Sequence, residues 1–151
     1  MTGGTLNNEG DSLVNMPGGR INNVGGLITH SAGAEFTNSG TVDNDAASNF
    51  VLGDLATFKN GGTFTNAGVF NTTSRSGDLV NQKGGVLANS GTWNQDGVGV
   101  LSNLANSTIN NSGSIVNDRK LVNAGVINNL CGGTVTGPVN GNQPVNVCSI
   151  N

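Results

Sequence analysis

Few side chains in this sequence are of types that perform chemistry, and they are scattered along the chain. Carboxylates occur two residues apart at Glu9 and Asp11 and again at Asp43 and Asp45, a spacing that can place both on one face of a strand. Paired carboxylates at a defined separation cleave glycosidic bonds. Neither pair has a neighbouring acidic or basic cluster, so we expect solvated corners, with polysaccharide cleavage as a remote alternative.

The only histidine, His30, lies between Thr29 and Ser31 and could act as a base toward Ser31. A lone histidine in a polar segment is most often an ordinary surface residue, and we expect that here. The sequence contains no Gly-Gly-x-Gly-x-Asp calcium repeat and no phosphate-binding loop. It therefore predicts no catalytic residues, no cofactor and no metal site.

The two cysteines, Cys131 and Cys148, enclose a short loop near the C-terminus. An even cysteine count favours a disulfide, which in a loop of this length contributes roughly 3 kcal/mol. The alternative is a pair of free thiols. The spacing fits neither a redox Cys-x-x-Cys pair nor a zinc site.

The composition limits the elements that could position such residues. Among 151 residues, only 34% are hydrophobic and 10% charged, while 26 are Asn and 25 Gly. This excludes helix bundles and leaves Asn/Gly-rich disorder or a turn-dense all-β fold. Six scattered basic residues and a net charge of -3 argue against a nucleic-acid partner. No apolar run is long enough to span a bilayer, and the chain shows no export signal.

An internal repeat is the strongest pattern in the sequence. Its phrase is an apolar residue, any residue, Asn, any residue and Gly, and full copies begin at Leu6, Ile21, Phe36, Phe64, Leu87, Ile109 and Leu121. Half-copies of the apolar-x-Asn kind begin at Leu13, Val42, Phe58, Leu79, Leu101, Ile115 and Ile127. From Phe36 onward the leading apolar residues are six to nine apart, and three steps often sum to about 22.

This arithmetic predicts an all-β parallel β-helix, or β-solenoid, with three short strands and roughly 20–23 residues per coil. We expect solenoid repeats over residues 1–130 and a C-terminal cap or joint over 131–151. The first copies are only 15 residues apart, which leaves open a two-stranded coil or a different register there. Trp93 takes a position that other copies fill with core residues, so packing is favoured over a sugar-stacking platform.

Asn and Gly should turn the corners of each coil. Asn tolerates the left-handed region, and its amide both donates and accepts hydrogen bonds, so stacked Asn side chains can form a ladder. Gly should supply the remaining positive-φ positions. The predicted turn and ladder positions are Asn8, Asn23, Asn38, Asn66, Asn89, Asn111, Asn123, Gly10, Gly25, Gly40, Gly68, Gly91, Gly113 and Gly125.

Two phrases, Gly61 to Asn71 and Gly85 to Asn94, resemble the haemagglutinin-type repeats of large bacterial surface and secreted proteins. These are autotransporter passengers and two-partner-secretion adhesins; sheath and fibre proteins use similar repeats. The resemblance covers most of residues 3–136 and implies a right-handed parallel β-helix. It also implies an extracellular or cell-surface location.

The sequence therefore suggests a non-catalytic structural protein. A solenoid exposes unpaired strand edges at both ends, and the N-terminal residues begin directly on the repeat without a cap. Our first hypothesis is self-association through these edges into a filament, sheath or coat. The alternative is an adhesin or secreted-passenger module that binds a cell-surface receptor or glycan. Neither hypothesis requires a nucleic acid or a membrane span.

Overall fold

The computed structural model describes residues 1–73, 77–96 and 98–148, and these residues form twenty-one short strands with no helix among them. Sheet 1 consists of β1 (Thr5–Glu9), β4 (Leu27–Ser31), β7 (Asn49–Leu52), β10 (Val69–Thr72), β13 (Thr92–Gln95), β16 (Ser114–Asn117) and β19 (Thr134–Thr136). Sheet 2 consists of β2 (Ser12–Asn15), β5 (Glu35–Asn38), β8 (Thr57–Asn60), β11 (Asp78–Asn81), β14 (Leu101–Asn103), β17 (Leu121–Asn123) and β20 (Val139–Gly141). Sheet 3 consists of β3 (Arg20–Asn23), β6 (Thr41–Asn44), β9 (Thr63–Asn66), β12 (Val86–Asn89), β15 (Thr108–Asn111), β18 (Val126–Leu130) and β21 (Val145–Val147).

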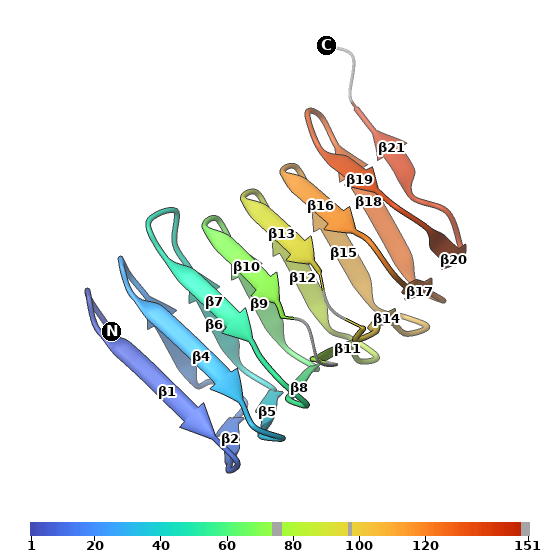
Figure 1. Cartoon of the computed structure of the whole chain (residues 1–151). Coiled ribbons are helices and arrows are strands. Elements are labelled where there is room, and N and C mark those ends of the chain that lie inside the picture. Colours follow the sequence, from blue (N-terminus) through green and yellow to red (C-terminus); the bar gives the residue numbers. More distant parts are fainter. Residues whose placement is uncertain (74–76, 97, 149–151) are drawn as a thin grey trace.

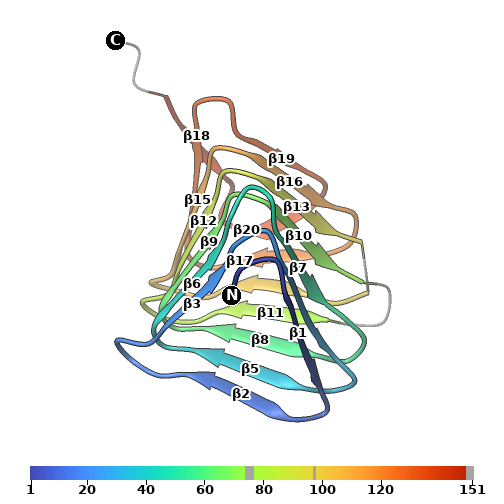
Figure 2. The ribbon, with the colours of Figure 1, turned by 90° about the vertical axis from the view of Figure 1, so that its left-hand side faces the viewer.

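The three sheets form a parallel β-solenoid of about six turns, which confirms the predicted fold class. Each strand pairs in parallel with the strand three places later, as Thr5 does with Leu27 and Leu27 with Asn49, about 22 residues per coil. Figure 1 shows the coils stacked along one axis with the termini at opposite ends, and Figure 2 shows the three-sided cross-section. With strands about 4.8 Å apart, seven strands per sheet give a rod about 30 Å long.

The first coils follow the same three-strand plan as the rest. Leu6, Ile21 and Phe36 lie on β1, β3 and β5, so successive copies of the phrase are two strands apart. The 15-residue spacing therefore reflects which corners carry the full Asn-x-Gly phrase. It needs neither a two-stranded coil nor a shifted register.

The core is a narrow column to which almost every strand contributes one apolar side chain; β7 contributes two, Phe50 and Leu52, and β21 none. Strand residues alternate between the interior and the surface, and the five Phe residues and Trp93 are all at most 1% exposed. The Phe36 and Phe58 rings stack with centroids 4.8 Å apart, and Trp93 packs edge-on against Phe70 at 5.1 Å. The expectation that Trp93 belongs to the core is confirmed.

Asparagine occupies the second inward position of most strands, two residues after the apolar one, and forms two ladders. We call the corner from sheet 2 to sheet 3 the second corner and the corner from sheet 3 to sheet 1 the third corner. Each amide nitrogen donates to the Oδ1 of the next coil's Asn at 2.8–3.1 Å. The second-corner ladder comprises Asn15, Asn38, Asn60, Asn81, Asn103 and Asn123; the third-corner ladder comprises Asn23, Asn44, Asn66, Asn89, Asn111, Asn129 and Asn146.

Of the two expected reasons for Asn at these positions, the hydrogen-bonded ladder is confirmed, but tolerance of the left-handed region is wrong, because no ladder Asn adopts a positive φ. Among the non-glycine residues described, only Ala32, Leu55 and Asn106 do. Apart from Asn129 and Asn146, the ladder residues are buried strand ends, and their amides satisfy backbone carbonyls. Asn60, for example, donates to the carbonyls of Gly62 and Val86 as well as to Asn81.

Glycine has two roles, of which the sequence predicted one. Gly10 and Gly25 have φ of 77° and 60°, as expected. Gly40, Gly68, Gly91, Gly113 and Gly125 have no positive φ; a Cβ on any of them would instead collide with a backbone carbonyl of the preceding coil. These five glycines permit close stacking of the coils.

The segment after residue 130 extends all three sheets. β19, β20 and β21 pair in parallel with β16, β17 and β18. The expected cap or joint is therefore built on a further coil, whose described part ends at Cys148; the last three residues of the predicted 131–151 segment lie outside the described residues.

Substitutions at two adjacent residues of β15 test how much the ladder contributes to stability. Asn111 is fully buried and bonds to Asn89, Asn129 and the carbonyls of Gly113 and Thr134, whereas Asn110 faces outward. We expect Asn111→Ala to lower the free energy of unfolding by about 2–4 kcal/mol, because it leaves buried partners without hydrogen bonds.

The control, Asn110→Ala, removes only the acceptor of the Asn128 amide and should cost less than about 1 kcal/mol. Urea unfolding of both variants measures the difference. Equal destabilisation would show that the ladder contributes little.

Candidate functional site

The two carboxylate pairs singled out from the sequence are engaged in local structure. Asp43 forms an ion pair with Arg20 at 2.7 Å. Asp45 accepts hydrogen bonds from the Ser48 hydroxyl and from the amides of Gly25 and Ala47, and the Ser48 bond is the largest cause of its lowered pKa. Asp45 thus stabilises a turn, and Asp43 forms its ion pair on the outer surface of β6.

The other pair, Glu9 and Asp11, lies where sheet 1 passes into sheet 2, which we call the first corner. Glu9 accepts a hydrogen bond from Asn7, and the backbone carbonyl of Asp11 accepts one from Asn8. Asn8, predicted as a ladder residue, contacts His30 in the next coil, and no Asn follows it there. The inward positions of this corner are Asn8, His30, Leu52, Thr72, Gln95 and Asn117, so it has no ladder.

The expectation that His30 is a surface residue is wrong, because its side chain is 1% exposed. Nδ1 lies 3.0 Å from the Asn8 amide nitrogen, and the ring packs against Phe36 with centroids 5.9 Å apart. Burial lowers the pKa of His30, outweighing the opposing effect of a hydrogen bond to the Ala34 backbone. The 22-residue period reveals this placement, since it aligns His30 with Asn8 on an inward row.

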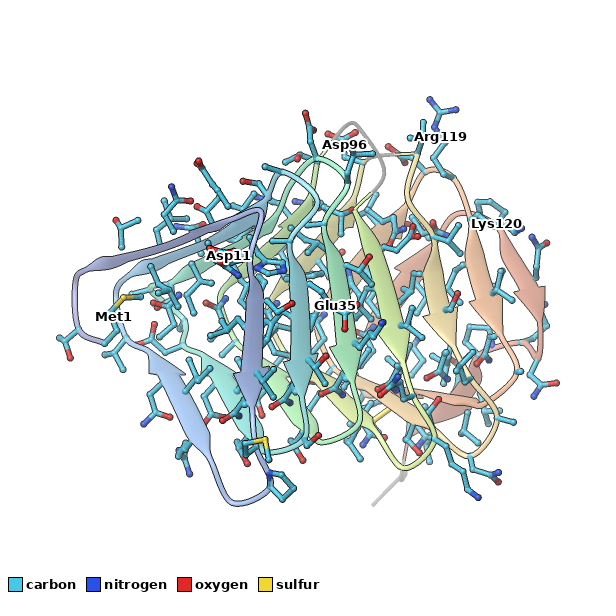
Figure 3. All side chains as sticks on the ribbon, turned by 90° about the horizontal axis from the view of Figure 1, so that it is seen from below. Met1, Asp11, Glu35, Asp96, Arg119 and Lys120 are labelled. Carbon is cyan, nitrogen blue, oxygen red and sulfur yellow. A yellow bond between two sulfur atoms is a disulfide. The ribbon has the colours of Figure 1, made fainter. Side chains whose placement is uncertain are left out.

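The first corner also carries most of the charge. Seven of the nine carboxylates lie on it or border it, namely Glu9, Asp11, Glu35, Asp54, Asp78, Asp96 and Asp118. Arg119 and Lys120 lie near its C-terminal end, and Figure 3 shows them at the opposite end of the rod from Asp11. The charge along this edge therefore has a direction, acidic at the first coil and net basic at the sixth.

Two shallow grooves run along the first corner. One is lined by Asn71, Asn94, Asp96 and Asp118, and the other by Glu9, Thr29, Ser31 and Asp54. In the described part of the chain, no three His, Cys, Asp or Glu side chains are placed to hold a metal ion. Each groove brings close together polar side chains, such as Glu9 and Asp54, that the sequence patterns did not place near one another.

The ends of the rod differ from its sides in their unpaired groups. β1 and β2 have no strand on their outer edges, nor do β19, β20 and β21 within the described residues. Among the described residues, six of the eleven exposed large apolar side chains lie in the first or last coil: Met1, Val14, Met16, Val24, Val145 and Val147. Unpaired parallel edges flanked by apolar side chains can add further strands.

The third-corner ladder has a direction that distinguishes the two ends. At the N-terminal end, Oδ1 of Asn23 is buried and has no hydrogen-bond partner among the described residues. At the C-terminal end, Asn146 is exposed, and its Oδ1 accepts from Asn129. One end thus offers an acceptor and the other an amide donor. The second-corner ladder ends differently, because Asn123 donates to the backbone carbonyl of Asn142.

Cys131 and Cys148 form a disulfide within the chain, which confirms the predicted pair. Cys131 follows β18 and Cys148 follows β21, so the bond ties the last strand of sheet 3 to its neighbour. It is compatible with an oxidising, extracellular compartment.

No protein-family model, curated protein or solved structure matches this chain. Among the residues described, no helical segment has the length and apolar character of a membrane span. The candidate functional surfaces are therefore identified from the geometry of the structure alone. They are the charged first corner and the two ends of the rod.

His30 should make stability depend on pH. Its pKa in the folded state lies below the unfolded value of about 6.5, so the neutral form is favoured by folding. The stability contributed by neutral His30 is complete above that unfolded value and declines as pH falls toward the folded pKa. Urea unfolding between neutral and mildly acidic pH measures the decline.

The control is His30→Gln, which places at this row the residue type that Gln95 supplies three coils later. The variant should lose the part of the pH dependence that His30 causes, while carboxylates titrate equally in both proteins. Identical pH profiles would show that His30 is not the responsible group.

Removing the disulfide should loosen the last coil only. In a Cys131→Ser, Cys148→Ser variant we expect faster amide hydrogen exchange in β21, with a stability loss of at most roughly 3 kcal/mol. Exchange in β9 and β12, several coils away, serves as the internal reference. Faster exchange there as well would mean that the disulfide supports the whole rod.

Proposed function

We propose that this chain is a non-catalytic structural protein that stacks head to tail on copies of itself, forming a filament, sheath or coat outside the cell. The observation that carries the proposal is the match between the two ends of the rod. At both ends the edges of sheets 1 and 2 are open, and the third-corner ladder of sheet 3 offers an acceptor at one end and a donor at the other.

The register of the coils specifies how copies would stack. Continuing the 22-residue plan places β19 of one copy against β1 of the next, β20 against β2 and β21 against β3. Val135 then lies beside Leu6 and Val139 beside Leu13, all of them partly buried side chains that pack on the core. The interior column continues across the junction without a polar interruption at these two rows.

Charge supports the same orientation. Glu9 and Asp11 of one copy would lie two coils from Arg119 and Lys120 of its neighbour, about 10 Å along the rod. That distance is close to the Debye length at physiological ionic strength, so the attraction is modest and sensitive to salt. Head-to-head stacking would instead bring the acidic ends together.

The resemblance of the repeats to haemagglutinin-type sequences supports a second candidate, an adhesin or secreted-passenger module. In that case the coils would present a side face to a receptor or glycan, and the ends would not meet other copies. The two candidates differ in whether purified chains assemble.

A dilution series separates them. We expect sedimentation velocity and negative-stain electron microscopy to show rods that lengthen with protein concentration. Reductant should not release covalently linked copies, because the disulfide lies within one chain. Uniform single particles at every concentration would contradict self-assembly and favour the adhesin module.

A cysteine pair tests the register of the junction. In the proposed stack, Asn7 of one copy lies beside Thr136 of the next with Cα atoms about 4.8 Å apart, within the range that a disulfide spans. A variant with Asn7→Cys and Thr136→Cys should therefore form covalent ladders on oxidation. The control, Asn7→Cys with Val116→Cys, places the cysteines about 10 Å apart and should not. Equal cross-linking in both would rule out this register.

A further inference from the structure

The first four residues lie against the third corner of the first coil and cover the C-terminal end of β3 there. Thr2 forms a parallel bridge with Val24, and the Met1 carbonyl accepts a hydrogen bond from the Val24 amide at 2.9 Å. Gly3 donates to the Val24 carbonyl and the Met1 amino group donates to the Asn22 carbonyl. The expectation that the N-terminus offers no cap is therefore wrong at the third corner, while the edges of β1 and β2 stay open.

These residues occupy the position that a neighbouring copy would need. In the stacked register, β21 of the next copy lies against β3, with Asn146 opposite Asn23. The Thr2–Val24 bridge places Met1 opposite Asn23 in the same row. Met1 and Asn146 thus compete for one place, whereas β19 and β20 meet no such obstacle.

Met1 fills that place poorly. The Met1 methyl carbon and Oδ1 of Asn23 lie 3.1 Å and 2.5 Å from the position of a Cβ built on Gly26, so both border the same small space. The thioether side chain has no N–H to donate, and Asn23 Oδ1 is a buried acceptor without a partner in the described chain. An Asn146 amide would complete the ladder with the same geometry that links Asn129 to Asn146, at 3.1 Å.

We infer that Met1–Gly4 is a displaceable cap that limits head-to-tail assembly, and that its competitor is β21 of a second copy of this chain. The inference rests on the proposed function and adds a feature of the chain that limits the proposed assembly. Displacement exchanges the hydrogen bonds that Met1–Gly4 make with Asn22, Val24 and Leu27 for those of strand β21 with β3 and the third corner, and it gives Asn23 the donor that the free chain lacks.

The test compares the full chain with a variant lacking Thr2–Gly4, in which Met1 can no longer reach Asn23. We expect the protein concentration at half-assembly to fall by about tenfold or more. A second variant, Gly3→Pro, releases the cap without shortening the chain, because proline has no N–H for Val24 and cannot adopt the φ of 62° found there. Circular dichroism and thermal unfolding check that both variants fold.

Asn146→Asp tests the specific contact within the shortened variant. A carboxylate can still accept from Asn129 but cannot donate to Asn23, so the gain in assembly should disappear. Asn140→Asp is the matched control: it adds the same charge to the same coil at an exposed position on β20 and should preserve most of the gain.

The outcomes distinguish the cap from the proposed function. If the full chain and both cap variants assemble at the same concentration, the cap is overturned while head-to-tail assembly stands. If none of them assembles, the proposed function fails and the cap inference falls with it. Assembly that is stronger in both cap variants, and lost with Asn146→Asp but not with Asn140→Asp, supports the inference.

Discussion

The buried Asn amide is the interaction on which this solenoid depends. A corner directs backbone carbonyls toward the interior, and a thin core has no water to satisfy them. Each ladder Asn gives its N–H groups to the next Asn and to nearby carbonyls, as Asn81 does with Asn103, Gly85 and Thr108. The Asn partner lies one coil away. Stability is therefore built from contacts between neighbouring coils, as in other repeat proteins.

This dependence explains why the sequence predicted the coil well and the roles of its residues less well. The spacing of apolar residues gave the three strands and the 22-residue coil, because every strand must bury one side chain on the column. The half-copies as a group, such as those that begin at Leu13 and Leu79, supply as many ladder residues as the full copies do. The Asn-x-Gly phrase is not required at a corner, because longer turns such as Gln82–Gly85 close a corner equally well.

The roles of Gly91 and His30 could not be read from residue type. A glycine needed for close approach looks the same in sequence as one needed for positive φ, and only the carbonyl of Gly68 in the preceding coil distinguishes them. His30 is polar in a polar segment, and only its place 22 residues after Asn8 shows that it points inward. At the first corner the ladder is absent, and residues as different as Leu52, Thr72 and Gln95 share the inward row.

The same interaction makes the two ends of the rod unequal. Because every ladder amide donates toward the C-terminal end, the first coil retains an acceptor and the last a donor, and no rotation makes these ends equivalent. Contacts between unlike ends do not close on themselves unless the stack bends into a ring, so they produce open filaments. A straight solenoid with strands in register has no such bend built into its coils. In the proposed filament, assembly would therefore be limited at an end, and Met1–Gly4 lie at the third corner, where the ladder lacks a donor at Asn23.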